Sequence, residues 1–229
     1  MQSLRSKLAG SPILVRVVPF ALFVLLGSFT GYGWYLAKTV LGALSLWVVW
    51  PLVAEMRWKF SWPGILVGVA IFVLWVGLDG LYPQTSELLA KVGLIKPVDE
   101  ATKAVWNPFI LYGEGALLAW FFVLVRLVGS SLVVPPLEEV FFRSFLYRYV
   151  ASKDFLGVPL DRFLPVPFLV SVLFFGFEHE QWLAGILCGC AYQGLVLWKG
   201  RLGDAMTAHA ITNFLLALWV INRGAWQFW

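Results

Sequence analysis

Charged residues are scarce in this chain of 229 residues. Only 13% of them are charged and 60% are hydrophobic, which gives a mean hydropathy of +0.81. Soluble domains are about half apolar and about a quarter charged, and disordered chains have low hydrophobicity. The composition therefore excludes a water-soluble globule and a disordered segment. The two cysteines are also too few for a disulfide-stabilised scaffold.

Aromatic side chains, in contrast, are abundant: 19 Phe, 13 Trp and 7 Tyr. Trp and Tyr gather at membrane interfaces, so this composition is typical of a polytopic membrane protein. The net charge of +4 is small, and no basic cluster is longer than Arg57–Trp58–Lys59. We therefore expect no nucleic-acid binding, and we expect the basic residues to set the membrane orientation.

Apolar runs long enough to cross a bilayer recur along the chain. A spanning helix needs about 20 apolar residues, because each rises about 1.5 Å through a core about 30 Å thick. The runs lie near residues 12–30, 34–54, 62–82, 113–134, 164–180, 181–199 and 204–221, and a shorter, charged one lies near 137–151. We predict an all-α, polytopic transmembrane helical bundle of about eight membrane helices. It would form a single integral membrane domain over 1–229, with the functional motifs in 113–221.

Loop charges predict how this bundle is oriented. If Arg5 and Lys7 lie in the cytoplasm, the loops that hold Arg57 and Lys199 also face the cytoplasm. We expect an integral protein of a bacterial or archaeal plasma membrane with a cytoplasmic N-terminus. The polar stretch 83–112 is either a surface loop or an amphipathic helix on the membrane, and the sequence does not decide between them.

The second half of the chain places ionisable residues at membrane depth, where they are costly unless paired or hydrated. Pro135–Pro136 is predicted to end one helix and begin another, so that Glu138 and Glu139 fall in a first helical turn that favours carboxylates. Arg143 shares a face with Glu139 and can pair with it, whereas Glu138 is rotated by about 100° and lacks that partner. Glu138 could be a general base, or both glutamates could be ordinary helix-start acids at a hydrated boundary.

The chain has only two histidines, His179 and His209, and both fall in the late helices. Phe175 lies one turn before His179, and Asn213 lies one turn after His209, each on the same face as its histidine. A lone histidine in a helix is more often a core residue than a catalyst. Here both histidines have an aromatic or amide neighbour and follow a double glutamate, which indicates function.

These residue types suggest that the protein activates water for hydrolysis inside the membrane. Glu138 would take a proton from water, and His179 would orient the water or protonate the leaving amine. His209 and Asn213 could donate hydrogen bonds to the tetrahedral oxyanion. The sequence has no G-x-S-x-G elbow and no complete H-E-x-x-H motif. A zinc ion bound by Glu138, His179 and His209 is a chemical alternative.

The order of these residues is similar to that of a known family. The chain carries E-E-x-x-x-R from Glu138, F-x-x-x-H from Phe175 and H-x-x-x-N from His209. Together they resemble the CAAX prenyl endopeptidase and bacteriocin-processing family (CPBP, or ABI), which includes the type II CAAX prenyl proteases. The resemblance covers residues 138–213, about a third of the chain. The length and the apolar N-terminal half also resemble the CAAX-protease-related proteins that accompany bacterial exosortase systems.

The resemblance implies a glutamate-dependent intramembrane endopeptidase with no obligatory cofactor. In that family the first Glu and first His of the motifs activate water, and the second His and the Asn stabilise the oxyanion. The substrate would be a membrane-anchored or lipidated peptide or protein, cut near its C-terminus at the lipid bilayer. The predicted site has Glu138, His179, His209 and Asn213 as catalytic residues and Glu139, Arg143 and Phe175 as supporting residues.

One feature departs from the expected pattern, namely the short connection after His179. If 181–199 crosses the bilayer upright, His209 lies about 15–20 Å in depth from His179. Catalysis requires the two imidazoles to be near one another. Either the helix that ends at His179 stops at mid-depth, or 181–199 is strongly tilted.

Two hypotheses outside hydrolysis also stay open. A non-enzymatic immunity or scaffold protein of the same fold would bind a peptide or a partner, and a small transporter would use Glu138, Arg126 and the histidines as a relay. The complete set of Glu, His, His and Asn favours the protease over the scaffold. The absence of repeat symmetry between the halves disfavours the transporter. Arg126 is expected to pair with Glu138 or Glu139, or to reach the interface.

Overall fold

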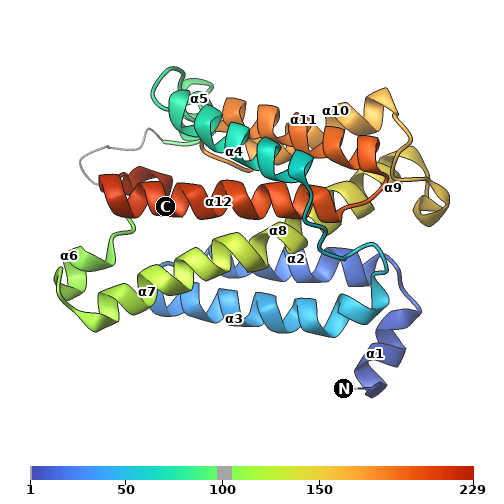
Figure 1. Ribbon diagram of the computed structural model, residues 1–229, viewed down its shortest axis with the longest axis horizontal. Helices are drawn as coiled ribbons and strands as arrows, with labels where there is room; N and C mark the ends of the chain where they lie inside the picture. The colour runs from blue at the N-terminus through green and yellow to red at the C-terminus, as the bar shows by residue number, and fades with distance from the viewer. Residues whose placement is uncertain (1, 97–104) are drawn as a thin grey trace.

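The structure is a computed structural model that describes residues 2–96 and 105–229, and within these ranges its regular secondary structure is helical (Figure 1). Three helices are long and apolar enough to cross a membrane: Tyr32–Leu52, Leu117–Ala151 and Gly203–Arg223. Three shorter apolar helices cover Leu14–Gly27, Trp62–Gly77 and Pro165–Phe177. The prediction of an all-α chain with membrane helices is thus confirmed for the described residues.

The helices follow the predicted apolar segments closely. In chain order they are α1 (Gln2–Ala9), α2 (Leu14–Gly27), α3 (Tyr32–Val49), α4 (Trp62–Gly77), α5 (Thr85–Lys91), α6 (Pro108–Tyr112), α7 (Leu117–Val128), α8 (Val134–Glu139), α9 (Tyr147–Ala151), α10 (Pro165–Phe177), α11 (Trp182–Lys199) and α12 (Gly203–Arg223). The polar stretch 83–112 holds the short helices α5 and α6, and its residues 97–104 lie outside the described ranges.

The prediction that Pro135–Pro136 separates two helices is wrong. Leu117–Ala151 is one helical run of 35 residues, in which the π-helical segments η2 (Gly129–Val133) and η3 (Val140–Leu146) join α7, α8 and α9. A proline removes an N–H and its ring presses on the carbonyl four residues back, and a wider π turn just before the prolines accommodates both effects. Glu138 and Glu139 therefore lie inside a long helix and not at a helix N-terminus, and the predicted segment 137–151 is the end of that helix.

Helix α12 lies between α4, α10 and α11 on one side and α7 and α8 on the other, with α2 and α3 beyond, while the α9 end of the long helix packs against α10 (Figure 1). It approaches α4 most closely at glycine: a Cβ atom on Gly68 would lie 2.6 Å from the carbonyl oxygen of Ala208. The Thr212 hydroxyl donates to the carbonyl oxygen of Gly68 at 2.9 Å. Together these contacts fix the turns of α12 that carry His209 and Asn213.

Helices α10 and α11 form a closely packed hairpin. A Cβ atom on Gly185 would lie 3.0 Å from the Cα atom of Gly176, so the two backbones touch where both residues are glycine. The Thr85 hydroxyl, at the start of α5, donates to the carbonyl oxygen of His179 at 2.6 Å in the turn between the two helices. Helix α5 therefore holds in place the turn that carries the first histidine.

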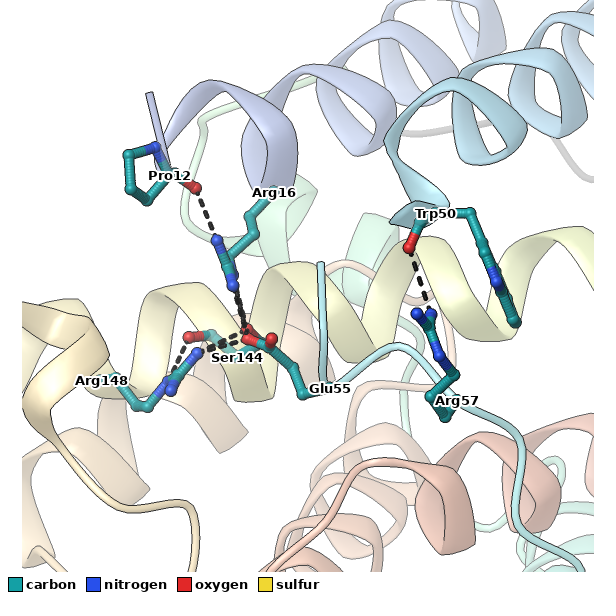
Figure 2. A network of polar contacts seen from close by, with 7 residues as sticks. All are labelled: Pro12, Arg16, Trp50, Glu55, Arg57, Ser144 and Arg148. Atoms are coloured by element: carbon teal, nitrogen blue, oxygen red, sulfur yellow. Dashed lines mark hydrogen bonds and ion pairs between the residues drawn. The ribbon is translucent and has the colours of Figure 1, made fainter. Parts of the chain in front are cut away.

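A second polar cluster joins α2, the loop after α3 and the end of the long helix (Figure 2). One carboxylate oxygen of Glu55 accepts from Arg16 Nη2 at 2.8 Å, from Arg148 Nη2 at 2.6 Å and from the Ser144 hydroxyl. The side chains of both arginines are less than a tenth exposed. This network, which the sequence analysis did not predict, fixes the long helix at one end of the bundle.

Candidate active site

A cavity of about 410 Å³ lies among α3, α4, α7, α8 and the helices α10 to α12. Its lining includes all four residues that the sequence analysis proposed as catalytic, and also the supporting residue Phe175. These residues come from three separate parts of the late sequence, which the fold brings to one cavity: Glu138, His179, His209 and Asn213.

Glu138 faces this cavity and is 8% exposed. Its Oε2 atom has no hydrogen-bond partner in the part of the chain that the structure describes, and it lies 3.9 Å from Nε2 of His209. As predicted, it does not pair with Arg143, because the pair that forms on this helix is between Arg143 and Glu139. Glu138 is thus a buried carboxylate with a free oxygen.

Glu139 lies behind the cavity wall and joins two buried groups. Its Oε2 atom is 3.3 Å from Nε of Arg143, which confirms the predicted pair, and its Oε1 atom accepts from Nδ1 of His209 at 3.1 Å. Glu139 and Arg143 are fully buried, so the alternative of a helix-start acid at a hydrated boundary does not fit Glu139. The Arg143 guanidinium lies 4.7 Å from the centre of the Phe175 ring, which covers it from the cavity side.

His209 is held between the two glutamates and the Tyr192 ring, on which it stacks at 5.2 Å. Since a carboxylate oxygen only accepts, Nδ1–H of His209 is the donor to Glu139. The other nitrogen, Nε2, therefore points toward Glu138 and the cavity. The contact between His209 and Glu139 is a carboxylate–histidine pair that fixes the ring's orientation.

His179 lies in the turn after α10, and its side chain folds back along that helix. Its Nδ1–H donates to the carbonyl oxygen of Phe175 at 2.8 Å, and Trp75 packs edge-on against its ring at 5.3 Å. The Phe175 ring lies 4.9 Å from the ring of His179 and 6.1 Å from that of His209. The expected conflict in depth does not occur, because His179 and His209 line the same cavity and both contact the Phe175 ring.

Asn213 is held by the π-helical segment of the long helix. Its amide nitrogen donates to the carbonyl oxygen of Ser130 at 2.8 Å, which uses one of its two N–H groups. Thr212 beside it accepts from the Tyr192 hydroxyl at 2.7 Å. Asn213 therefore keeps a fixed position on the cavity wall and retains a second amide hydrogen for a ligand.

Comparison with known protein families identifies one segment of the chain. Residues 116–215 match the family described as Type II CAAX prenyl endopeptidase Rce1-like. This segment is an Rce1-like CAAX prenyl endopeptidase domain. The family consists of peptide hydrolases, and membership implies an intramembrane protease. No curated protein and no solved structure matches the chain.

The Rce1-like domain does not form the cavity alone. Trp75 from α4, together with Tyr35 and Lys38 from α3, lines it from outside the matched residues. Lys38 was missed by the sequence analysis, although the rule that marks intramembrane charges as functional candidates would have found it. The N-terminal helices thus contribute one wall of the cavity beside the Rce1-like domain.

Arg126 of the Rce1-like domain does not pair with Glu138 or Glu139, contrary to expectation. Its guanidinium carbon lies 4.7 Å from the ring centre of Tyr35, 4.6 Å from that of Trp106 and 5.6 Å from that of Trp229. These aromatic faces hold it on the cavity wall.

The zinc alternative finds no ligand set among the residues that the structure describes. No group of three or more His, Cys, Asp or Glu side chains there is arranged to hold a metal ion. Each histidine donates from Nδ1, His179 to a backbone carbonyl and His209 to Glu139, which leaves Nε2 of both rings free for a ligand.

Proposed function

We propose that this protein is a glutamate-dependent intramembrane endopeptidase that cuts near the C-terminus of a membrane-anchored or lipidated substrate. The observation that carries the proposal is that Glu138, His179, His209 and Asn213 line one buried cavity, in which Glu138 has a free carboxylate oxygen. The match of residues 116–215 to the type II CAAX prenyl endopeptidase family supports a protein substrate, and a prenylated C-terminal CAAX segment is our candidate for it.

The proposed reaction begins with a water molecule between Glu138 and His179. Glu138 takes one proton from the water while Nε2 of His179 accepts a hydrogen bond from it, and the oxygen attacks the scissile carbonyl carbon. Glu138 then gives the proton to the leaving nitrogen as the C–N bond breaks. The second water hydrogen leaves the new carboxyl group as a proton and is taken up by the released amine, so the products are a carboxylate and an ammonium group.

The reaction also requires that the negative oxygen of the tetrahedral intermediate is stabilised. With Nδ1–H of His209 bound to Glu139, a proton on Nε2 makes His209 an imidazolium that the carboxylate stabilises. Nε2–H of His209 and the second amide hydrogen of Asn213 then donate to the oxyanion. Glu139 is a positioning residue here, since it acts through His209.

We also propose that residues 1–229 form one membrane domain with a cytoplasmic N-terminus, in which α7, α8 and α9 cross the bilayer as one element. The merger of the segments 113–134 and 137–151 lowers the proposed number of crossings from about eight to about seven. The basic loops after α3, after α9 and before α12 then all face the same side, in agreement with the loop charges.

The proposal is tested by cleavage of an S-farnesylated peptide that ends in cysteine and three further residues, with the protein in lipid nanodiscs. We expect Glu138→Ala, His179→Ala and His209→Ala each to lower kcat/KM by about 10²–10⁴-fold, and Asn213→Ala by about 10²–10³-fold. Glu87→Ala, on the exposed surface of α5, is the control and should cleave normally.

Three results would contradict the proposal. Cleavage that persists in all four variants would show that the reaction occurs elsewhere. A wild-type protein that binds the peptide but leaves it intact would favour the scaffold hypothesis. Activity lost on chelation and restored by zinc would favour a metal-dependent protease instead.

A further inference from the structure

Two cations line the same cavity without an ionic partner. Lys38 on α3 and Arg126 on α7 are half-buried, and neither forms an ion pair in the part of the chain that the structure describes. Lys38 Nζ lies 4.8 Å from the ring centres of both Phe23 and Tyr35. Arg126 lies over the same Tyr35 ring at 4.7 Å, so the two positive groups share one aromatic residue.

Two positive charges this close together are unfavourable inside a membrane protein. The positive charge of Arg126 acts on the Lys38 ammonium, and two like charges in a site of low polarity repel each other. Aromatic faces give each cation about 0.5–2 kcal/mol, which is less than a desolvated ion pair would give. The two cations make this wall of the cavity positively charged, so an anion bound against it would be stabilised.

The carboxylates of the protein itself do not fill this role. Glu138 and Glu178 also line the cavity, and the charge of Glu138 acts on Lys38, but neither glutamate forms an ion pair with Lys38 or Arg126 among the described residues. In the proposed function Glu138 has to stay free to take a proton from water. The two cations are thus available to a ligand.

A peptide that is cut near its C-terminus brings its own anion into the cavity. Three extended residues span at most about 10–11 Å, so the terminal carboxylate of such a peptide stays close to the cut bond. A lysine and an arginine together bind a carboxylate through charge-assisted hydrogen bonds. A lipid phosphate could accept similar hydrogen bonds, but no covalent connection to the cut bond would place it beside Glu138.

We propose that Lys38 and Arg126 bind the C-terminal carboxylate of the substrate, and thereby select peptides whose cut bond lies a few residues from a free C-terminus. This inference rests on the proposed endopeptidase function, whose substrate specificity it explains. Lys38 lies outside the matched residues 116–215, so this part of the specificity comes from the N-terminal helices.

The test is a binding measurement, so that it does not depend on cleavage. The Glu138→Gln protein in nanodiscs is titrated with the farnesylated peptide in two forms, one with a free C-terminal carboxylate and one with a C-terminal amide. We expect the carboxylate form to bind about 10–100-fold more tightly. Lys38→Met and Arg126→Met should each remove most of this difference while leaving the affinity for the amide unchanged.

Matched controls separate recognition from folding. Lys153→Met and Arg162→Met change the same residue types in the exposed loop after α9, away from the cavity, and should keep the preference. Lys38→Arg and Arg126→Lys keep the charge and should retain most of it. If thermal unfolding of Lys38→Met or Arg126→Met is altered, Lys38→Gln or Arg126→Gln, which also removes the charge, takes its place in the comparison.

Equal affinity for the two peptides, including no binding of either, would overturn the proposal. A short-chain phosphatidylglycerol that displaces both peptides equally, where phosphatidylcholine does not, would assign the cations to a lipid phosphate and would also overturn it. A carboxylate preference without cleavage by the wild-type protein would instead refute the endopeptidase function and leave the carboxylate site in place.

Discussion

Two buried clusters of charge lie on the same long helix, and they differ in how completely their polar atoms are paired. Around Glu55, one carboxylate oxygen accepts from Arg16, Arg148 and Ser144 (Figure 2). Around Glu138 and Glu139, Oε2 of Glu138 and Nη2 of Arg143 are buried without a hydrogen bond among the described residues. Oε2 of Glu139 and Nε of Arg143 meet each other only in an ion pair at 3.3 Å.

The difference separates a structural site from a reactive one. Buried polar groups are normally hydrogen-bonded, because an unpaired one costs about 1–3 kcal/mol. A cluster that meets this requirement holds helices together. A cluster that leaves a carboxylate oxygen free beside a cavity keeps it available for a ligand, as active sites do. On this view the first cluster stabilises the bundle, and the second is where chemistry occurs.

The largest expected effect is on activity, from Glu138→Gln. The amide keeps the shape of the carboxylate but cannot take a proton, so cleavage should fall by about 10²–10⁴-fold. Stability should be unchanged or higher, since a buried charge without a partner is removed. Peptide cleavage and thermal unfolding in the same nanodiscs measure both quantities. A large loss of stability would show that Glu138 is a structural residue.

Glu55→Ala is expected to lower stability and to leave activity almost unchanged, which is the opposite of Glu138→Gln. Removal of this carboxylate leaves Arg16 and Arg148 buried without their partner, which should lower the free energy of unfolding by about 3–5 kcal/mol. Activity per folded molecule should stay near that of the wild type. Denaturant unfolding followed by circular dichroism, together with active-site titration, tests this. Loss of kcat at full folding would place Glu55 in the catalytic machinery.

Glu139→Gln should have an intermediate effect. The amide still accepts from Nδ1–H of His209, but it no longer stabilises the imidazolium, so we expect kcat to fall by about 10–100-fold with little change in KM. Steady-state kinetics of the wild type and the variant measure both constants. A rise in KM with kcat unchanged would mean that Glu139 does not act on the chemical step through His209.

The smallest effect concerns acid stability. Burial alone raises the pKa of Glu55, but the Ser144 hydroxyl and Arg16 outweigh it and hold the pKa below its usual value. The unfolded chain therefore binds the proton more readily, and the stabilisation is present above the usual carboxyl pKa and is lost as the pH falls through the lower, folded value. Wild-type and Glu55→Ala unfolding curves should converge in that acid range. A constant difference down to the lowest pH would contradict this.

Much of this molecule was predictable from local sequence. The membrane helices follow from runs of apolar residues, and the pair between Glu139 and Arg143 follows from a spacing of four on one helix face. Short-range rules of this kind need no knowledge of the tertiary fold. The same rules picked out the three motifs, all of which lie within the residues that match the Rce1-like family.

The predictions were wrong or incomplete where contacts between distant parts of the chain determine the local structure. Proline was expected to break the helix, but π turns beside Pro135–Pro136 keep it continuous. His209 bonds to a glutamate 70 residues away, which no local spacing reveals. The depth of His179 depended on its side chain folding back to the carbonyl of Phe175. Each of these details was set by packing against another helix or by a side-chain rotamer.

The central claim is that Glu138 and His179 act on the same water molecule. It is tested most directly by a double-mutant cycle of kcat/KM for Glu138→Gln, His179→Ala and the double variant. If both groups serve one proton transfer, the double variant should be about as slow as the slower single variant, because the second loss removes nothing further. If instead the two losses multiply, the residues act independently, and the proposed activation of a shared water molecule is wrong.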